Sequence, residues 1–129
     1  HLPVYILFTG NKTYRALPYG FRLARHQTPG DFLALVKGAK LVLSTSFHGT
    51  VFALRFGTPF YALKAKRGAV YYTDPRIATL LQTAGVAERY LPCDRAEEIH
   101  TAPLHRNPAL LDRAVAESRA FLQEGLTAR

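Results

Sequence analysis

The 129-residue sequence contains no methionine, no tryptophan and a single cysteine, Cys93. One thiol can form no internal disulfide and leaves no cysteine cluster for a structural zinc ion. We therefore expect neither a disulfide nor a zinc–cysteine site to stabilise this chain. We expect Cys93, between a proline and an aspartate, to be a structural or surface thiol. Because the chain starts with histidine instead of methionine, we interpret it as an excised or processed fragment.

Long hydrophobic runs are also absent, and acidic side chains are few. No apolar stretch approaches the roughly 18 residues that a membrane helix needs, and the apolar segment 2–8 lacks the basic lead-in of a secretory signal. We therefore expect no membrane span and a cytoplasmic location. Seventeen Lys and Arg against nine Asp and Glu give a net charge of +8, which favours anionic partners. Nucleic-acid modules usually show a basic stripe or a known motif, and since neither is present we expect no nucleic-acid partner.

Short apolar runs alternate with helical patterns along the chain. Strands are predicted near residues 3–9, 41–43, 60–63 and 90–91, and helices near 28–38, 48–56, 74–85 and 107–126. Thr28 with Pro29 and Asp31, and later Asp74 with Pro75, are typical helix starts. The alternation predicts a single α/β domain over residues 1–129, a Rossmann-like three-layer fold with a mainly parallel sheet.

The segment Ser44–Thr50 is a polar turn between a predicted strand and a predicted helix, at the sheet edge where α/β proteins bind ligands. The first N–H groups of a helix suit a phosphate or carboxylate. Ser46 and Thr50 add hydroxyl groups, Gly49 would let a ligand approach the backbone, and His48 can transfer a proton near neutral pH. The same residues also fit a structural interpretation, with Ser46 as helix cap, Gly49 as packing glycine and His48 as structural histidine.

Basic residues follow the next predicted strand at the same edge. Lys64, Lys66 and Arg67 would ordinarily form a solvated loop, but their position also suits phosphate binding. Arg76 lies in the first turn of a predicted helix, where a cation opposes the helix dipole, so an anionic partner is the alternative to a misplaced charge.

Known cofactor and nucleophile motifs are missing. The sequence contains no dinucleotide fingerprint, no P-loop and no nucleophile elbow. The histidines other than His48 show no metal-ligand spacing. We therefore predict neither a metal nor a cofactor.

The stretch from Pro29 through Leu41–Thr50 to Phe60 strongly resembles the polysaccharide pyruvyl transferase family. Members of this family carry a helix ending in alanine, a strand, a serine-containing turn with His-Gly, and a helix that closes at G-x-P. The later Asp74–Ile77 segment is similar to a downstream part of the family. The resemblance covers about residues 28–122, and its most specific part is Ser46–Thr50.

The resemblance implies a bacterial enzyme that moves the pyruvyl group of phosphoenolpyruvate onto a sugar of a cell-surface polysaccharide, forming a pyruvate ketal. It implies the C-terminal half of a two-domain transferase of the GT-B type, with the N-terminal half absent and the fragment inactive alone. Phosphoenolpyruvate and a glycan acceptor are then the partners. At the position of Phe47 some relatives have arginine, whose role another cation would have to take.

Taken with the resemblance, the sequence predicts His48 as the catalytic residue and a substrate-binding set of Ser46, Gly49, Thr50, Lys64, Lys66, Arg67 and Arg76. Two alternatives stay open. The chain could be the C-terminal half of a nucleotide-sugar glycosyltransferase, with a diphosphate at the same helix N-terminus. It could also be a non-catalytic module that binds anions or nucleic acid.

Overall fold

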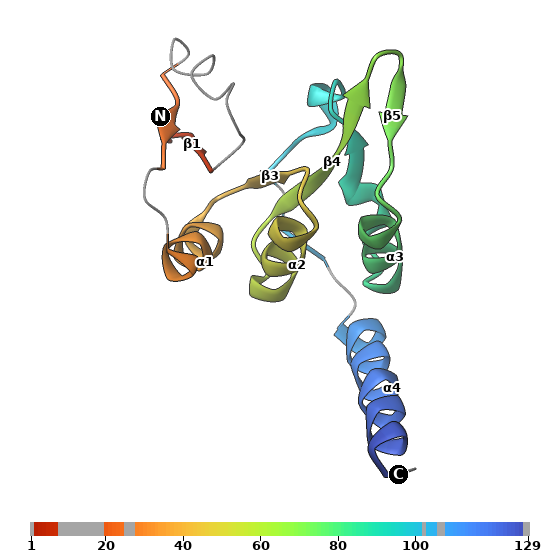
Figure 1. The fold of residues 1–129 in the computed structure, drawn as a ribbon. Coiled ribbons are helices and arrows are strands. Elements are labelled where there is room, and N and C mark those ends of the chain that lie inside the picture. The colour runs from red at the N-terminus through yellow and green to blue at the C-terminus, as the bar shows by residue number, and fades with distance from the viewer. Residues whose placement is uncertain (1, 8–19, 25–27, 102, 106–107, 128–129) are drawn as a thin grey trace. The chain divides into compact units, whose positions relative to one another are not determined.

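The computed structural model describes residues 2–7, 20–24, 28–101, 103–105 and 108–127 (Figure 1). The chain falls into two compact units, His1–Leu35 and Val36–Arg129. The expectation of one domain over all 129 residues stays a prediction.

The first unit contains a short parallel pair of strands. Strand β1 (Tyr5–Ile6) pairs with β2 (Arg22–Leu23), with Tyr5 opposite Arg22 and Ile6 opposite Leu23. The Arg22 N–H donates to the Val4 carbonyl at 2.8 Å, just outside the ladder. The strand predicted over residues 3–9 is therefore present at its centre, whereas residues 8 and 9 lie outside the described part.

Helix α1 (Pro29–Gly38) begins and ends where the sequence predicts. The Thr28 hydroxyl oxygen accepts the Asp31 N–H at 3.2 Å, and Asp31 Oδ2 accepts the Thr28 N–H at 2.9 Å and its hydroxyl at 2.7 Å. This reciprocal cap satisfies donors that the first helical turn leaves unpaired. The hydrogen bonds from Thr28 lower the pKa of the Asp31 carboxyl below its ordinary value.

The second unit alternates strands and helices. Its strands are β3 (Val42–Ser44), β4 (Phe60–Arg67), β5 (Val70–Tyr72) and β6 (Tyr90–Pro92). Its helices are α2 (Phe47–Phe56), α3 (Pro75–Thr83) and α4 (Pro108–Thr127), with 3-10 turns at Ala87–Arg89 and Ala96–Glu98. Strands β3 and β6 both run parallel to β4, which lies between them. The predicted α/β class with a mainly parallel sheet is confirmed.

Strand β4 is longer than the sequence predicts. It continues past Leu63 to Arg67, and its last three residues, beyond both parallel neighbours, pair antiparallel with β5 (Figure 1). The two-residue connection includes Gly68 at φ 63°, a conformation that glycine adopts without steric cost. The expectation that Lys64, Lys66 and Arg67 form a loop is therefore wrong, because cross-strand pairing keeps this basic stretch extended.

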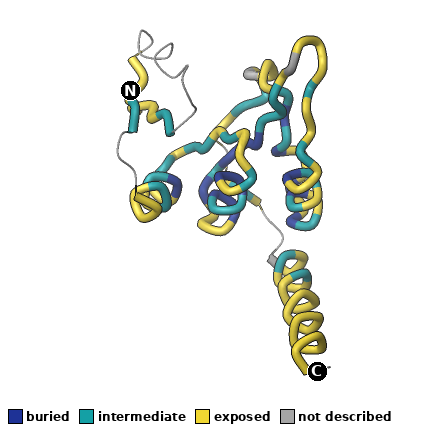
Figure 2. The backbone as a smooth tube through the Cα atoms, viewed as in Figure 1, coloured by how far each residue is buried: buried dark blue, intermediate teal, exposed yellow. Residues whose placement is uncertain are grey.

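The core of the second unit lies where α2 and α3 cover one face of β4. Its largest fully buried side chains include Phe60 of β4, Leu54 of α2, and Ile77 and Leu81 of α3. Figure 2 shows buried residues along β4 and on these two helices, whereas α4 is almost entirely exposed. Gly57, at φ 71°, ends α2 by donating its N–H to the carbonyls of the last helical turn.

The other face of β4 carries a polar cluster. The buried Tyr61 lies under the Arg89 guanidinium, whose Cζ is 4.8 Å from the ring centroid. The Tyr61 hydroxyl is 3.0 Å from His100 Nδ1, and Arg89 Nη2 donates to the Pro103 carbonyl at 3.2 Å. These contacts hold the segment after β6 against the sheet. His100 thus has a buried partner.

Within the described residues, no helix is both long enough and apolar enough to span a membrane.

Candidate functional site

The turn between β3 and α2 is held by hydrogen bonds among its own residues. Ser44 Oγ accepts the Ser46 N–H at 3.0 Å and donates to the Ser46 carbonyl at 3.1 Å. Ser46 is the N-cap of α2, with its Oγ 3.5 Å from the Gly49 nitrogen. The Ser46 carbonyl also accepts the Thr50 N–H at 3.1 Å and the Thr50 hydroxyl at 2.9 Å. The helix-cap interpretation of Ser46 is thus confirmed, and the side chain is still exposed.

Gly49 and Thr50 are buried on the inner side of this turn. A Cβ atom on Gly49 would lie 3.2 Å from Ser44 Cβ and closer still to Ser44 Oγ, so a side chain fits only if the Ser44 hydroxyl rotates and the turn shifts slightly. Thr50 is 0% exposed, and its hydroxyl is directed to the Ser46 carbonyl. Both positions therefore support the turn. Their contact with a substrate stays a prediction.

His48 is exposed on the first turn of α2. Its ring meets the Phe47 ring edge-on, with centroids 5.9 Å apart and planes at 74°. Its imidazole nitrogens form no hydrogen bond with the residues that the structure describes. A structural histidine would ordinarily bond its ring nitrogens to protein groups. The arrangement instead leaves them accessible to a ligand.

Arg76 lies beside the His48 turn, although 28 positions separate the two residues in the sequence. It occupies the first turn of α3, with its Cζ 5.2 Å from the Phe47 ring centroid. Asp74, the N-cap of α3, accepts Arg76 Nη2 at 2.7 Å and Nε at 3.1 Å. This bidentate pair lowers the pKa of Asp74 and raises that of Arg76. The cation that opposes the helix dipole is therefore partly compensated by the capping carboxylate.

Tyr90 connects the start of α3 to Lys64. Its hydroxyl accepts the Asp74 N–H at 2.8 Å, and the Lys64 Nζ lies 5.1 Å from its ring centroid. Burial of the Tyr90 phenol raises its pKa. Lys64 and Lys66 are two residues apart on β4 and so share one face of the strand, the face covered by α2 and α3.

Lys66 belongs to a second cluster at the end of β4. Its Nζ donates to Asp94 Oδ2 at 3.1 Å and lies 5.3 Å from the Tyr71 ring centroid. The Tyr71 hydroxyl donates to the same Asp94 oxygen. The hydrogen bond from Tyr71, followed by that from Lys66, lowers the pKa of Asp94. The bond to Asp94 raises the pKa values of Lys66 and Tyr71, so Asp94 and Lys66 stay charged and Tyr71 neutral around pH 7.

A chain of contacts thus joins three of the predicted site residues, Lys64, Arg76 and His48, along one sheet edge. It runs from Lys64 through Tyr90, Asp74 and Arg76 to Phe47, whose neighbour is His48. Figure 1 shows the start of α2 and the start of α3 side by side at this edge. Arg67 ends β4, and its side chain lies outside the described part of the structure.

This edge can bind an anion and move a proton. The exposed Arg76 guanidinium and the N–H groups of Phe47 and His48 at the start of α2 are donors suited to a phosphate or a carboxylate. The accessible His48 imidazole can donate or accept a proton beside them. The capping and packing roles of Ser46 and Gly49 fix the backbone from which that imidazole projects.

Sequence reasoning missed three members of the edge: Asp94, Tyr71 and Tyr90. Asp94 enters the sequence predictions only as the neighbour of Cys93. Asp94 lies three positions after the strand predicted at residues 90–91, however, and parallel strands end at a common edge, so its proximity to Lys66 could be predicted. Tyr71 had none, because the sequence does not predict β5.

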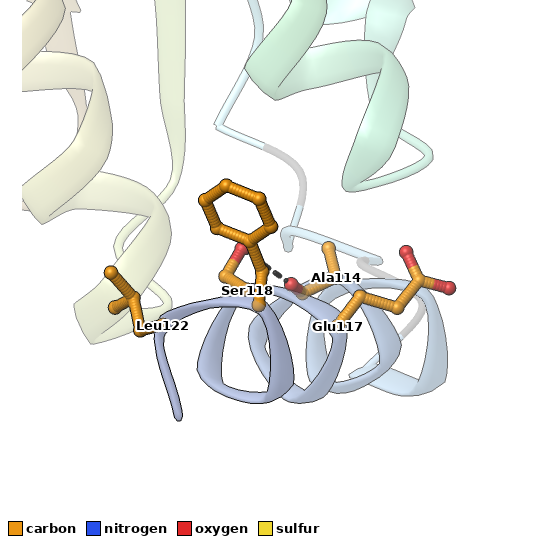
Figure 3. Close-up of a pocket in the computed structure, with 5 residues that line it drawn as sticks. Ala114, Glu117, Ser118 and Leu122 are labelled. Atoms are coloured by element: carbon orange, nitrogen blue, oxygen red, sulfur yellow. Dashed lines mark hydrogen bonds between the residues drawn. The ribbon is translucent and has the colours of Figure 1, made fainter. Parts of the chain in front are cut away.

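No group of three metal-ligating side chains occurs among the residues that the structure describes. A shallow hollow does occur on α4, lined by Ala114, Glu117, Ser118, Phe121 and Leu122 (Figure 3). All five residues come from this one helix, where Ser118 Oγ donates to the Ala114 carbonyl at 2.9 Å. None of the predicted site residues lines this hollow, so it gives the site no support.

The fold is that of an α/β protein whose parallel strands end at a basic edge bearing an exposed histidine. Comparison with protein families gives a match to part of the chain. The model described as polysaccharide pyruvyl transferase matches residues 4–66, just under half of the chain, and confirms the resemblance to this family of transferases. Comparisons with curated proteins and with solved structures give no match.

The family match covers the Ser44–Thr50 turn together with Lys64 and Lys66. It begins earlier than the resemblance found in the sequence, which starts near residue 28, and it ends before Arg76 and Asp94. The likeness of the segment after residue 66 therefore stays a prediction. The contacts of Arg76 with Phe47 are an independent reason to include this residue in the site.

Proposed function

We propose that this chain is the C-terminal half of a polysaccharide pyruvyl transferase. The enzyme transfers the pyruvyl group of phosphoenolpyruvate to a sugar of a cell-surface polysaccharide in the cytoplasm and forms a pyruvate ketal. One observation carries the proposal: an exposed His48 lies inside the segment that matches the family, and the Arg76 guanidinium lies 5.2 Å from the ring of its neighbour Phe47.

The reaction needs a proton donor, a base and a clamp for the phosphate. A proton adds to the methylene carbon of phosphoenolpyruvate, and the neighbouring carbon gains oxocarbenium character. One sugar hydroxyl adds to that carbon, and a second displaces phosphate, so two C–O bonds form and one breaks. The first hydroxyl proton replaces the one given to the methylene carbon, and the second leaves with phosphate. Fixed cations stabilise the charge that moves onto the departing phosphate.

His48 takes one of the two proton roles, since its imidazole is accessible and its helix position is fixed by the Ser46 cap. A second acid or base is then required, and we assign it to the N-terminal half of the enzyme. This division fits a site in the cleft between two halves, which is why we expect the 129-residue chain to bind the donor but not to turn it over.

We assign different contacts with the donor to the different cations. Arg76 binds Asp74 through Nε and Nη2, and its remaining N–H groups on Nη1 and Nη2 still match the geometry of an oxyanion pair, so it suits bidentate contact with the phosphate. Lys64 and Lys66, on the same face of β4, supply further positive charge, as does Arg67 at the end of that strand. Some relatives have arginine at the position of Phe47. We propose that the Arg76 guanidinium, which lies over the Phe47 ring, takes the role of that arginine in this chain. Ser46 contacts the donor through its exposed hydroxyl, whereas Gly49 and Thr50 act mainly by shaping the turn.

Substitution of His48 tests this assignment in the enzyme with both halves present. We expect His48→Ala to abolish ketal formation while circular dichroism and thermal unfolding stay unchanged, because the side chain is exposed and bonds to no described residue. His105→Ala is the matched control, since His105 is an exposed histidine in a segment without regular secondary structure. Wild-type turnover by the His48→Ala enzyme would sink the proposal.

A further inference from the structure

Three chain segments meet at the carboxylate of Asp94. Lys66 reaches it from β4, Tyr71 from β5, and Asp94 itself lies two residues beyond the end of β6. Both donors bond the same oxygen, Oδ2. The cluster therefore ties the extended β4–β5 hairpin to the end of the parallel sheet, on the edge that carries the candidate site.

These contacts fix the Lys66 ammonium without hiding it. An ammonium has three N–H donors, and in the described structure one of them is directed to Asp94 while the Tyr71 ring flanks the group at 5.3 Å. The Lys66 side chain is still 45% exposed, and that of Asp94 is 49% exposed. Lys64, the other lysine on this face, has no carboxylate partner among the described residues.

We infer that Asp94 and Tyr71 are positioning residues, which hold the Lys66 ammonium in place for the phosphate of an anionic donor. This inference rests on the proposed function. A lysine side chain that rotates freely must be ordered when it binds a ligand, and that ordering weakens binding. A lysine already held in one orientation avoids most of this loss.

Simple charge attraction makes the opposite prediction. Asp94 is an anion beside a site for anions, so its neutralisation alone should strengthen phosphate binding. Positioning predicts that the same change weakens binding, because Lys66 loses its anchor. The sign of the change therefore separates the two explanations.

The first test needs no ligand. Nitrogen-15 NMR of the lysine ammonium groups should show a slowly exchanging Lys66 signal in the 129-residue chain, and Asp94→Asn should broaden or remove it. Lys64 serves as the internal comparison and should be unaffected. An unchanged Lys66 signal in Asp94→Asn would overturn the positioning role, whatever the enzyme proves to do.

The second test is calorimetry with phosphoenolpyruvate. We expect Asp94→Asn to raise Kd about three- to tenfold, the range for the ordering of one flexible side chain. Tyr71→Phe should raise it by a smaller factor, since Lys66 keeps its carboxylate. In a Lys66→Ala background Asp94→Asn should have no further effect, because a positioning residue acts only through its partner.

Glu117→Gln is the matched control, since it removes one exposed carboxylate from an Arg113–Glu117 pair on α4 and should leave Kd unchanged. Tighter or unchanged binding in Asp94→Asn overturns the inference and leaves the proposed function standing. Failure of the wild-type chain to bind phosphoenolpyruvate overturns both. The NMR result separates these cases, because it tests the placement of Lys66 directly.

Discussion

The His48 turn and the Lys66 cluster present polar groups at the same sheet edge, but they are built differently. The bonds of the turn join residues two to four positions apart and rest on the buried Gly49 and Thr50. The Lys66 cluster joins residues 28 and 23 positions apart through exposed side chains. Buried close packing resists change, whereas exposed ion pairs contribute little to folding. The turn should therefore govern stability, whereas changes to the cluster should cost little folding free energy.

The largest effect should come from filling the space at Gly49. We expect Gly49→Ala to destabilise the second unit by about 1–3 kcal/mol, the usual penalty for overpacking, because the new Cβ meets Ser44. Urea unfolding followed by circular dichroism measures the change. Gly125→Ala is the matched control, since this helical glycine has open space at its Cβ. A Gly49→Ala chain as stable as that control would show that the turn is not tightly packed.

A smaller effect is expected from the Thr50 hydroxyl. Thr50→Val keeps the shape of the side chain and removes its bond to the Ser46 carbonyl, which should cost about 1 kcal/mol at this fully buried position. Thr127→Val removes a similar bond, to the Gln123 carbonyl, at an exposed position of α4. Urea unfolding should show the larger loss for Thr50. Equal losses would contradict the contrast between buried turn and exposed surface.

The smallest effect on folding should be that of acid on the Lys66 cluster. Because the folded-state pKa of Asp94 is lowered, its pairing with Lys66 persists above its ordinary pKa of 3.8 and is lost only as the pH falls through a still lower value. Carbon-13 NMR of the carboxyl group should follow this titration. Tyr71→Phe and Lys66→Ala should each raise the Asp94 pKa, since the hydrogen bonds from Tyr71 and Lys66 both lower it. An Asp94 pKa that is unchanged in both variants would show that neither side chain pairs with this carboxylate.

The same contrast explains which parts the sequence predicts. Caps and stops are local, so the starts of α1 at Thr28 and of α3 at Asp74 and the end of α2 at Gly57 are all read correctly. The contact of Arg76 with Phe47 depends instead on how α2 and α3 pack. The sequence spacing of Arg76 and Phe47 does not predict this contact.

Strand β4 shows the second limit of sequence reasoning. Its apolar run ends at Leu63, and lysines at positions 64 and 66 are typical of a loop, yet pairing with β5 extends the strand to Arg67. Burial is also set by tertiary packing. Phe56 of α2 is 36% exposed, whereas the small residues Gly49 and Ala53 of the same helix are buried, because close approach of the helix to the sheet favours them.

The central claim is that this edge binds phosphoenolpyruvate as the donor of a pyruvyl transferase. Isothermal titration calorimetry with phosphoenolpyruvate and with a UDP-sugar, on wild-type and Arg76→Ala protein with both halves present, tests it most directly. We predict binding of phosphoenolpyruvate that weakens at least about tenfold in Arg76→Ala, as expected for loss of a charge-assisted bidentate contact, and no binding of the UDP-sugar. Binding of the UDP-sugar without binding of phosphoenolpyruvate would contradict the claim and favour a glycosyltransferase.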